Sequence, residues 1–418
     1  MFSFLTSNNV LNKNQHGFRP KHCTKTALFN LCNQIYDNMT ANRYTFCTIL
    51  DLSKAFDLVD HEILCSKLDH YGIRGVALEV IRSYLKDRFI MVVNEKEDTA
   101  KTKMPPVGVP QGSILGPLLY IIFVNDLPNV NTNSQILLYA HDTALINNDY
   151  CIQQCLPRIE NDLQSLHKWF SMNKLKLNEA KTTFCIFGTR HMISSAKSSV
   201  ITLNFNNTLS RPVKELKYLG MILDETLSFK SHIEKLSTRL SKTLGILSNI
   251  KHLIPISIKK NIYSSLILSH LNYCSTIWCN ANQTDINKLR VILNRACRHI
   301  LNIRETKTPS IYLYRKLNWL MVDERLALNT ALDFYKLHHK IYSYDLILPP
   351  RLSEIHSHDT RQNSLFDLPL VSSEYGKRNL NYSVASFINS LPSCISIDLP
   401  ISVFKRNYSE YLRSLRID

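Results

Sequence analysis

The sequence lacks any apolar run long enough to cross a bilayer. Its most apolar stretch, Ile114–Val124, is far shorter than the ~20 residues that a membrane-spanning helix needs, and it contains Gly116 and Pro117. The N-terminal residues also lack the basic-then-apolar order of a signal peptide. We therefore expect an intracellular protein, cytoplasmic or nuclear, with no transmembrane segment and no membrane partner.

Cysteine pairs of the kind that build disulfide scaffolds or zinc fingers are absent as well. The 11 cysteines are an odd, scattered set without a CxxC pair, which argues for a reducing compartment. The residues Cys274, Cys279, Cys297 and His299 could be imagined as a zinc site, but their spacing fits no zinc-binding pattern. Free cysteine is commonly a small buried apolar residue, so we do not expect zinc.

Acidic residues are scarce relative to basic ones. Lys and Arg total 50 against 34 Asp and Glu, which gives a formal net charge of +16. A surplus of that size favours a polyanionic partner, with nucleic acid ahead of an anionic membrane. The hydrophobic content of 44% is typical of a folded chain, and this length suffices for roughly two to four domains.

Neither an internal repeat nor a low-complexity tract interrupts the chain, so its periodicity can be interpreted directly. Two apolar runs around a short polar tip in residues 135–146 predict a β-hairpin. Helices are expected at 24–40, 60–71, 76–86, from about 113, and at 151–173, 231–250 and 255–269, and strands at 44–51, 181–187 and 213–223. The first half is therefore α+β, and the second half is mostly helical.

Two acidic residues fall at strand ends in this pattern. Asp51 closes the strand at 44–51, and Asp142 lies at the tip of the 135–146 hairpin. Carboxylates on adjacent strands can chelate two divalent metal ions that clamp the attacking and leaving oxygens of a phosphoryl transfer. Mg²⁺ suits such a site because it prefers oxygen ligands. The alternative is that both residues simply face loops, as acidic residues at strand ends commonly do.

The motifs around these residues resemble, in the same order, those of reverse transcriptases of the non-LTR retrotransposon and group II intron type. Leu50–His61 (LDLSKAFDLVDH) resembles the first palm motif, and Val109–Pro117 (VPQGSILGP) resembles the second. Leu138–Thr143 (LYAHDT) resembles the third, which is normally aromatic-Ala-Asp-Asp-Thr. Upstream, Gln15–Arg19 (QHGFR) is similar to a fingers motif.

Downstream segments continue the resemblance. Leu177–Thr182 (LNEAKT) and Tyr218–Gly220 (YLG) resemble the fourth motif and the primer grip. Ser269–Cys274 (SHLNYC) and His358–Arg361 (HDTR) are similar to the region beyond the palm in Jockey- and CR1-like elements. The resemblance implies an RNA-directed DNA polymerase, a nucleotidyltransferase, with an RNA template, a DNA primer, deoxynucleoside triphosphates and Mg²⁺. Little precedes the fingers motif, so we expect an N-terminally truncated genomic copy.

The fold implied by this family is a right-hand polymerase, α+β with a mostly helical C-terminal region. Residues 1–44 would be a remnant of the fingers, and 45–225 the palm with finger segments. Residues 226–300 would be a helical thumb, and 301–418 a helical C-terminal region without an assigned role. Template specificity, oligomeric state and host are not defined by the sequence.

The family's site residues carry over position by position. Asp51 and Asp142 would be catalytic carboxylates that bind the metal, and the Leu52 carbonyl would be a further ligand. The Lys54 and Ala55 amides would hold the triphosphate. The other implied contacts are Phe56 against the sugar, where it would exclude a 2′-hydroxyl, Gln111 and Gly112 beside the nucleotide, Arg19 and Lys181 at its phosphates, and Tyr218, Leu219 and Gly220 at the primer.

Each of these residues also has a plain structural interpretation. Phe56 could be an ordinary core aromatic, Lys181 a solvated surface charge, and Asp57 and Asp60 are expected to be structural or exposed. The thumb candidates Lys235, Arg239 and Lys242 follow spacings of four and three, so they share one helix face. Ile233, Leu236, Leu240 and Leu244 form a different, apolar stripe. With the net charge of +16, we expect the basic face to contact the template–primer.

The hairpin departs from the family at one position. The chain has His141 and Asp142 where the family has two Asp residues, and the first of those is the direct metal ligand. An imidazole carries no negative charge and suits softer transition metals than Mg²⁺, so Mn²⁺ should be better tolerated. We expect a catalytically impaired copy, weak or inactive. Two alternatives stay open: a non-enzymatic nucleic-acid-binding remnant, and a domesticated interaction scaffold.

Overall fold

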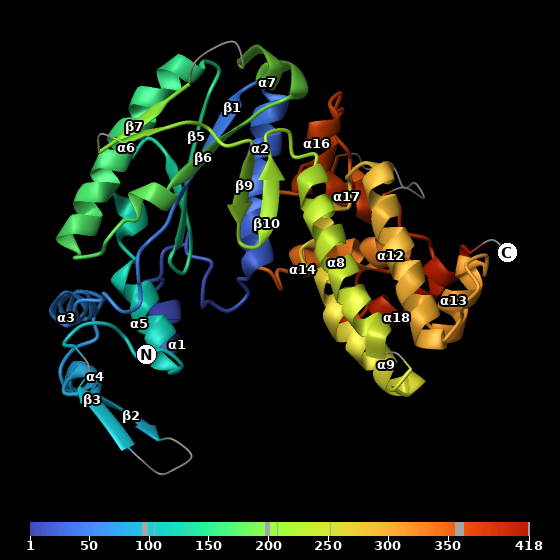
Figure 1. Ribbon diagram of the computed structural model, residues 1–418. Coiled ribbons are helices and arrows are strands. Elements are labelled where there is room, and N and C mark those ends of the chain that lie inside the picture. Colours follow the sequence, from blue (N-terminus) through green and yellow to red (C-terminus); the bar gives the residue numbers. More distant parts are fainter. Residues whose placement is uncertain are drawn as a thin grey trace. The chain divides into compact units, whose positions relative to one another are not determined.

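The chain forms two compact units in the computed structural model (Figure 1). Unit 1 comprises Met1–Ala27 and Asn42–Lys214, and unit 2 comprises Leu28–Ala41 and Glu215–Asp418. The structure describes residues 1–93, 99–103, 105–130, 132–196, 201–206, 208–250, 252–355 and 363–416. The segment His358–Arg361, one of those with a family resemblance, lies outside the described residues.

Unit 1 is built on a four-stranded antiparallel sheet with the order β4-β5-β1-β6 (Figure 1). Its strands are β1 (Tyr44–Leu50), β4 (Gln135–Tyr139), β5 (Asp142–Asp149) and β6 (Thr183–Phe187). β1 is rich in β-branched and aromatic residues, which suit a buried pleated surface. Leu50 pairs with Thr143 of β5, and Ile49 pairs with Thr183 of β6. The end of β1 is therefore flanked by strands on both sides.

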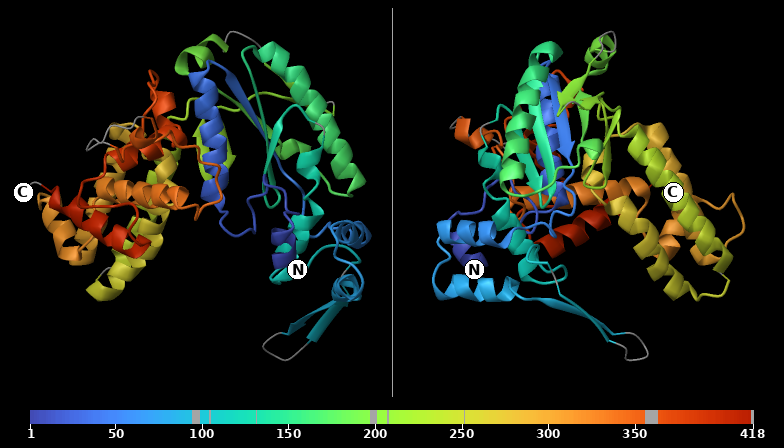
Figure 2. Two further views of the ribbon diagram at one scale, coloured as in Figure 1. Left: turned by 180° about the vertical axis from the view of Figure 1, so that it is seen from behind. Right: turned by 60° about the vertical axis from the view of Figure 1, so that its left-hand side comes forward.

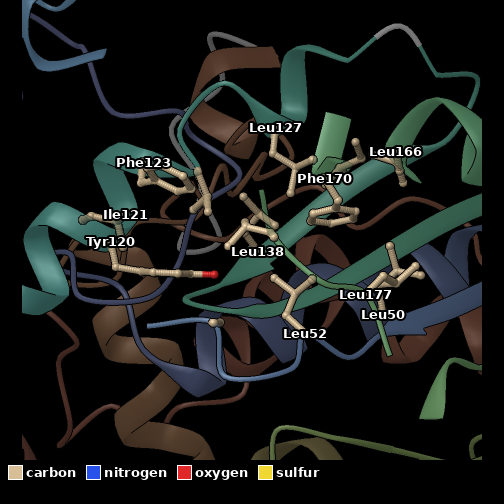
Figure 3. Close-up of a cluster of buried hydrophobic side chains, with 14 of the residues drawn as sticks. Leu50, Leu52, Tyr120, Ile121, Phe123, Leu127, Leu138, Leu166, Phe170 and Leu177 are labelled. Atoms are coloured by element: carbon tan, nitrogen blue, oxygen red, sulfur yellow. The ribbon is translucent and has the colours of Figure 1, made fainter. Parts of the chain in front are cut away.

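One face of this sheet packs against α5 (Leu115–Phe123) and α6 (Ile152–Met172). α5 is apolar nearly all round and most of its residues are buried, as expected for an enclosed helix. α6 is amphipathic and buries Leu163, Leu166 and Phe170 at helical spacing. Figure 3 shows Leu50 and Leu138 of the sheet gathered with Phe170 in this core. The core therefore anchors the strand end that carries Asp51.

The other elements of unit 1 are short helices and hairpins. Asp60 accepts hydrogen bonds from the Glu62 and Ile63 amides, both at 3.0 Å, and forms a 2.6 Å ion pair with Lys174. It thereby caps α3, as its expected structural role requires. These elements are α1 (Phe2–Ser7), α3 (His61–His70), α4 (Val76–Leu85), β2 (Phe89–Val93), β3 (Thr99–Lys103), η1 (Leu127–Asn129), η2 (Glu179–Lys181), α7 (Arg190–Ala196), β7 (Leu203–Phe205) and β8 (Thr208–Ser210).

Unit 2 is mostly helical, and Figure 2 shows its helices from two further sides. α14 packs on α18 over a second core that contains Tyr335 and Phe404. Its elements are α2 (Thr24–Thr40), β9 (Glu215–Tyr218), β10 (Met221–Asp224), α8 (Lys230–Ile250), α9 (Ile256–Tyr263), η3 (Ser264–Leu268), α10 (Ser269–Asn272), α11 (Ser275–Trp278), α12 (Gln283–Leu301), α13 (Ser310–Leu317), α14 (Val322–His338), α15 (Leu352–Ile355), α16 (Glu374–Arg378), α17 (Leu380–Asn389) and α18 (Ile401–Ser414).

Most of the expected elements are confirmed, including the helix at 24–40 and the hairpin at 135–146. Residues 213–223 form two short strands because Leu219 and Gly220 adopt φ of +45° and +78° and reverse the chain between them. Residues 255–269 begin as α9 but continue through the π-helical turn η3. Among the described residues, every helix is too short or too polar to cross a bilayer. The division into fingers, palm and thumb stays a prediction.

Candidate active site

The end of β1 brings the candidate carboxylates together. Leu50 pairs with Thr143 in an antiparallel register, so Asp51 and Asp142 lie at the same end of two neighbouring strands. On the other side, the Asn178 amide donates to the Asp51 carbonyl at 2.8 Å. Lys181, from the same segment, places its Nζ 3.6 Å from Asp51 Oδ2. Asp51, Asp142 and Lys181 therefore line one site, although they come from three separate motifs.

The two carboxylates interact electrostatically. Burial raises the pKa of Asp142, His141 lowers it, and the negative charge of Asp51 raises it further. His141 Nε2 lies 3.7 Å from Asp142 Oδ1, which is too long for a hydrogen bond. Within the described part of the chain, the ligand atoms of Asp51, His141 and Asp142 do not all lie within 4.8 Å of one another. The three side chains therefore form an open site rather than a closed chelate.

The imidazole ring of His141 lies beside the aromatic ring of Phe56. The centroids of the two rings are 5.8 Å apart. Phe56 is half-buried, stacks on Tyr120 at 4.4 Å and meets the edge of Phe18 at 6.3 Å. The Nδ1 atom of His141 is buried and has no hydrogen-bond partner among the described residues. Phe56 thus contacts both Tyr120 of the core and His141, which stands where the family has its first Asp.

The turn after β1 exposes consecutive backbone amides. Lys54 adopts a left-handed φ of +50°, and its carbonyl accepts from the Asp57 and Leu58 amides at 2.9 and 3.1 Å. The N–H groups of Lys54, Ala55 and Phe56 donate to no acceptor in the described part of the protein. Successive free amides in such a turn make a concave anion-binding site. The expected contact of these amides with a triphosphate stays a prediction.

The second motif is tied to the same turn. Gln111 Nε2 donates to Asp57 Oδ1 at 2.9 Å, and the Val109 amide donates to the Phe56 carbonyl at 2.9 Å. Gly112 has φ +80° and open space where a Cβ would lie, so its conformation rather than crowding calls for glycine. The structure therefore brings Gln111 and Gly112 next to the Phe56 turn.

Arg19 is engaged within its own loop. Its Nη1 donates to the carbonyls of Asn12 and Gln15 at 2.5 and 3.3 Å. The side chain is half-buried, and burial lowers its pKa. These contacts compete with the phosphate contact expected from the sequence, because the guanidinium already holds the loop in place.

The sequence did not predict the role of Gln15. This residue is 1% exposed, and its Oε1 accepts hydrogen bonds from the Ala140 amide at 2.9 Å and the Gly17 amide at 2.7 Å. Its Nε2 donates to the Ala140 carbonyl at 3.4 Å. Ala140 is the first residue of the hairpin tip and has φ +55°. Gln15 therefore holds a strained non-glycine residue directly before His141.

The absence of a side chain at Gly17 allows the Gln15 loop to approach the backbone of Ala140 closely. A Cβ built on Gly17 would lie 2.3 Å from the Ala140 nitrogen and 2.9 Å from the Ala140 Cα. Both are backbone atoms that cannot rotate away. The only sequence signal was that Gln15–Arg19 belongs to the same ordered series of motifs as the hairpin.

The candidate primer grip lies in unit 2. Leu219 and Gly220 form the turn of the β9–β10 hairpin that begins after Tyr218. Tyr273 Oη donates to the Leu219 carbonyl at 2.6 Å, and its ring lies against Gly220. Two segments with family resemblance therefore contact each other. The role of this turn in primer binding stays a prediction.

The basic face of α8, defined as Lys235, Arg239 and Lys242, is exposed as expected, and the apolar stripe on the same helix is buried. Lys235 Nζ forms a 2.6 Å ion pair with Glu215 Oε2, so part of its charge is compensated. Arg239 and Lys242 have no ion pair among the described residues. These two are the better placed of the three for contact with a polyanion.

The cysteine set considered for zinc does not converge. Within the described residues, the group of three potential ligands whose atoms lie within 4.8 Å of one another is His338, His339 and Asp398. Cys274 and Cys297 are buried, and burial raises the pKa of the Cys297 thiol to about 12. A thiol of that kind behaves as a small apolar side chain.

Comparison with known proteins supports the family resemblance. Residues 2–223 match a family model described as reverse transcriptase (RNA-dependent DNA polymerase). A probable RNA-directed DNA polymerase from transposon BS of Drosophila melanogaster is 30% identical over 369 residues, covering 83% of this chain and 39% of that protein. The RNA-directed DNA polymerase from mobile element jockey of Drosophila funebris is 29% identical over 310 residues, 71% of this chain and 33% of that protein. The chain thus spans between a third and two fifths of these curated relatives.

A solved structure of telomerase from Candida albicans, in complex with a fragment of telomeric RNA, is also similar. It shares 12% sequence identity, and the similarity covers 83% of this chain and 58% of that chain with a TM-score of 0.38.

Proposed function

Because the chain belongs to the reverse transcriptase (RNA-dependent DNA polymerase) family, we propose that it is the polymerase part of a non-LTR retrotransposon protein. The reaction is extension of a DNA primer 3′-hydroxyl on an RNA template with deoxynucleoside triphosphates. The observation that carries this proposal is the convergence at one strand end of Asp51, Asp142 and the free amides of Lys54 and Ala55. Primer extension on an RNA template, with radiolabelled nucleotides, tests it directly.

Polymerases of this family generally use divalent metal ions such as Mg²⁺. The carboxylates of Asp51 and Asp142 and the carbonyl of Leu52, which accepts no hydrogen bond from the described residues, are the hard oxygen donors that Mg²⁺ prefers. These donors fit one ion. They do not fit a closely spaced pair, because His141 supplies a single nitrogen instead of a second hairpin carboxylate. When bound, the ion would stabilise charge on the phosphoryl oxygens.

The residues of the chain itself bind and orient the nucleotide in this proposal. The free backbone amides of Lys54 and Ala55 hold the triphosphate, and Lys181 supplies a positive charge beside Asp51. Phe56 lies under the sugar, where its position is supported by stacking on Tyr120 and by the Val109 amide. A bulky ring in that place excludes a 2′-hydroxyl by contact alone.

Replacing the Phe56 ring should weaken sugar selection. In a His141→Asp background, we expect Phe56→Ala to lower the preference for deoxynucleotides over ribonucleotides by roughly 10- to 100-fold. The ratio of kcat/KM values for the two nucleotides measures this effect. Phe18→Ala is the matched control, since Phe18 contacts the same ring but is 51% exposed. Equal loss of selectivity in both variants, or unchanged selectivity in Phe56→Ala, would contradict the role of Phe56.

The basic face of α8 should contribute to nucleic-acid affinity. We expect the double variant Arg239→Ala, Lys242→Ala to reduce the magnitude of the negative slope of log K against log salt by roughly 1.4 to 1.8, at 0.7–0.9 per lost phosphate contact. Adding Lys235→Ala should change the slope less, because Lys235 is paired with Glu215. Lys405→Ala with Arg406→Ala, two exposed cations on α18, is the control. A slope that falls equally in the control would rule against this face.

A second candidate function is nucleic-acid binding without catalysis. It is favoured by His141 at the position of a family ligand and by the raised pKa of Asp142, both of which weaken metal binding. RNA binding that depends on salt, together with the absence of nucleotide incorporation in Mg²⁺ and Mn²⁺, would select this alternative. Absence of both binding and incorporation would favour the interaction scaffold.

A further inference from the structure

A pocket with a volume of about 740 Å³ lies in unit 2 at the C-terminal end of α12. Its lining includes three arginines, Arg295, Arg298 and Arg304, and two histidines, His252 and His299. None of its lining residues is acidic. The ionisable side chains that line the pocket are therefore all basic.

Among the described residues, the charge of this pocket has no acidic counterpart. The three arginines form no ion pair within the described ranges, and Glu305, beside Arg304 in sequence, does not line the pocket. Guanidinium groups stay charged at all physiological pH values. Repulsion between guanidinium groups that lie close together without a carboxylate costs electrostatic free energy, which an anionic ligand would offset.

A buried lysine, Lys259, donates a hydrogen bond to one of the residues that line the pocket. Lys259, on α9, is 1% exposed, and its Nζ donates to Asn302 Oδ1 at 2.6 Å. Asn302 is itself a lining residue and ends α12 with φ +57°. The contact fixes the wall of the pocket at Asn302.

Stabilisation of the helix end explains only part of the cluster. Arg298 and His299 lie in the last turn of α12, where cations interact favourably with the helix dipole. Arg295 lies one turn earlier, and His252 and Arg304 belong to segments outside the helix. Two arginines, Arg295 and Arg304, and His252 therefore line the pocket at positions that the helix dipole does not explain.

We propose that this pocket binds phosphate groups of the nucleic-acid backbone. The planar guanidinium matches a phosphate in a bidentate manner, and several arginines in one concave site favour phosphate over a single carboxylate. The site extends the nucleic-acid contact of unit 2 from α8 to the end of α12. It rests on the proposed function, because the polymerase supplies the nucleic acid.

The test is a salt titration of nucleic-acid binding by the full chain, measured by fluorescence anisotropy. The probes are a single-stranded RNA and an RNA–DNA duplex, at roughly 50 to 200 mM salt. We expect Arg295→Gln, Arg298→Gln and Arg304→Gln together to lower the salt slope by roughly 2.1 to 2.7. The control is Lys405→Gln with Arg406→Gln, which should leave the slope unchanged. If the triple variant does not fold, Arg295→Gln with Arg304→Gln, both exposed positions, should lower the slope by roughly 1.4 to 1.8.

The outcomes separate this inference from the proposed function. Binding by the unaltered chain with the same slope in the pocket variants would overturn the inference alone. A slope that falls as expected, without any primer extension by the His141→Asp variant in Mg²⁺ or Mn²⁺, would overturn the polymerase activity alone. Inorganic triphosphate is a further probe: if it raises the melting temperature of the unaltered chain but not of the variants, while nucleic-acid slopes are equal, the pocket takes free phosphates and the nucleic-acid assignment is wrong. Failure of the unaltered chain to bind any probe would overturn both.

Discussion

His141→Asp is expected to raise Mg²⁺-dependent DNA synthesis by roughly two to four orders of magnitude. The substitution returns a negative charge and two oxygen ligands to the hairpin tip, beside Asp142 and opposite Asp51. A lost ligand carboxylate is estimated at about 3–5 kcal/mol of transition-state stabilisation, and each ~1.36 kcal/mol is a tenfold change in rate. Primer extension on an RNA template measures the gain.

The tip should accept the new side chain. The His141 side chain is 43% exposed, so the carboxylate would not need to be buried. The backbone conformation depends on Ala140 and Gln15, which the substitution does not alter. The unaltered chain should extend primers better in Mn²⁺ than in Mg²⁺, because Mn²⁺ tolerates nitrogen ligands. That metal preference should reverse in His141→Asp.

Two controls separate charge from shape. His141→Asn restores one oxygen ligand but no charge, so its gain should be much smaller than that of His141→Asp. His191→Asp places the same change at an exposed position on α7 of unit 1 and should have no effect. Robust Mg²⁺-dependent extension by the unaltered chain, with no gain in His141→Asp, would mean that residue 141 does not occupy the ligand position.

The acidic limb of the pH profile should also move. The pKa of Asp142 is raised by burial and by Asp51, so the carboxylate is lost as the pH falls through this raised value. In His141→Asp, a further negative charge replaces a group that lowers the pKa of Asp142. In the metal-free site, the Asp142 carboxylate of His141→Asp should therefore be lost at a higher pH than in the unaltered chain, and the pH dependence of Mg²⁺ affinity measures this shift.

Local patterns were sufficient to predict much of the fold. The helix at 24–40 and the strand ending before Asp51 have strong periodicity, and their boundaries agree with α2 and β1 within one residue. Such elements are defined by neighbouring residues and need no knowledge of the tertiary structure.

The contacts of individual side chains could not be predicted in this way. The donation of Arg19 to Asn12 and Gln15 and the ion pair of Lys235 with Glu215 depend on how loops return to the same place. The pocket at the end of α12 combines His252 with residues about 40 positions later. None of these pairs has a characteristic spacing. Sequence reasoning therefore assigned Arg19 and Lys235 to phosphates without accounting for their partners inside the protein.

Gly17→Ala is expected to destabilise the catalytic hairpin by about 2–4 kcal/mol. The new Cβ would lie 2.3 Å from the Ala140 nitrogen, so either the hairpin tip or the loop before it must move. Overpacking of this kind costs about 1–3 kcal/mol. Movement would also break the buried hydrogen bonds of Gln15, and each unsatisfied buried group costs about 1–3 kcal/mol.

Hydrogen–deuterium exchange of residues 135–146 is the appropriate measurement, because it reports local opening of the hairpin separately from the rest of the chain. Exchange should accelerate roughly 30- to 1,000-fold in Gly17→Ala, at tenfold per ~1.36 kcal/mol, and remain unchanged in α12. Gln15→Met, which keeps the length of the side chain but removes its polar end, should produce a similar change confined to the same segment.

The matched control is Gly245→Ala, since this glycine lies within α8 and a Cβ there would meet nothing within 4 Å. It should stabilise the helix by up to ~1 kcal/mol and leave the hairpin unaffected. In the His141→Asp background, Gly17→Ala should remove most of the rescued synthesis while Gly245→Ala retains it, because only the former displaces residue 141. Unchanged exchange in the hairpin of both Gly17→Ala and Gln15→Met would show that the 15–17 segment does not set the position of the catalytic tip.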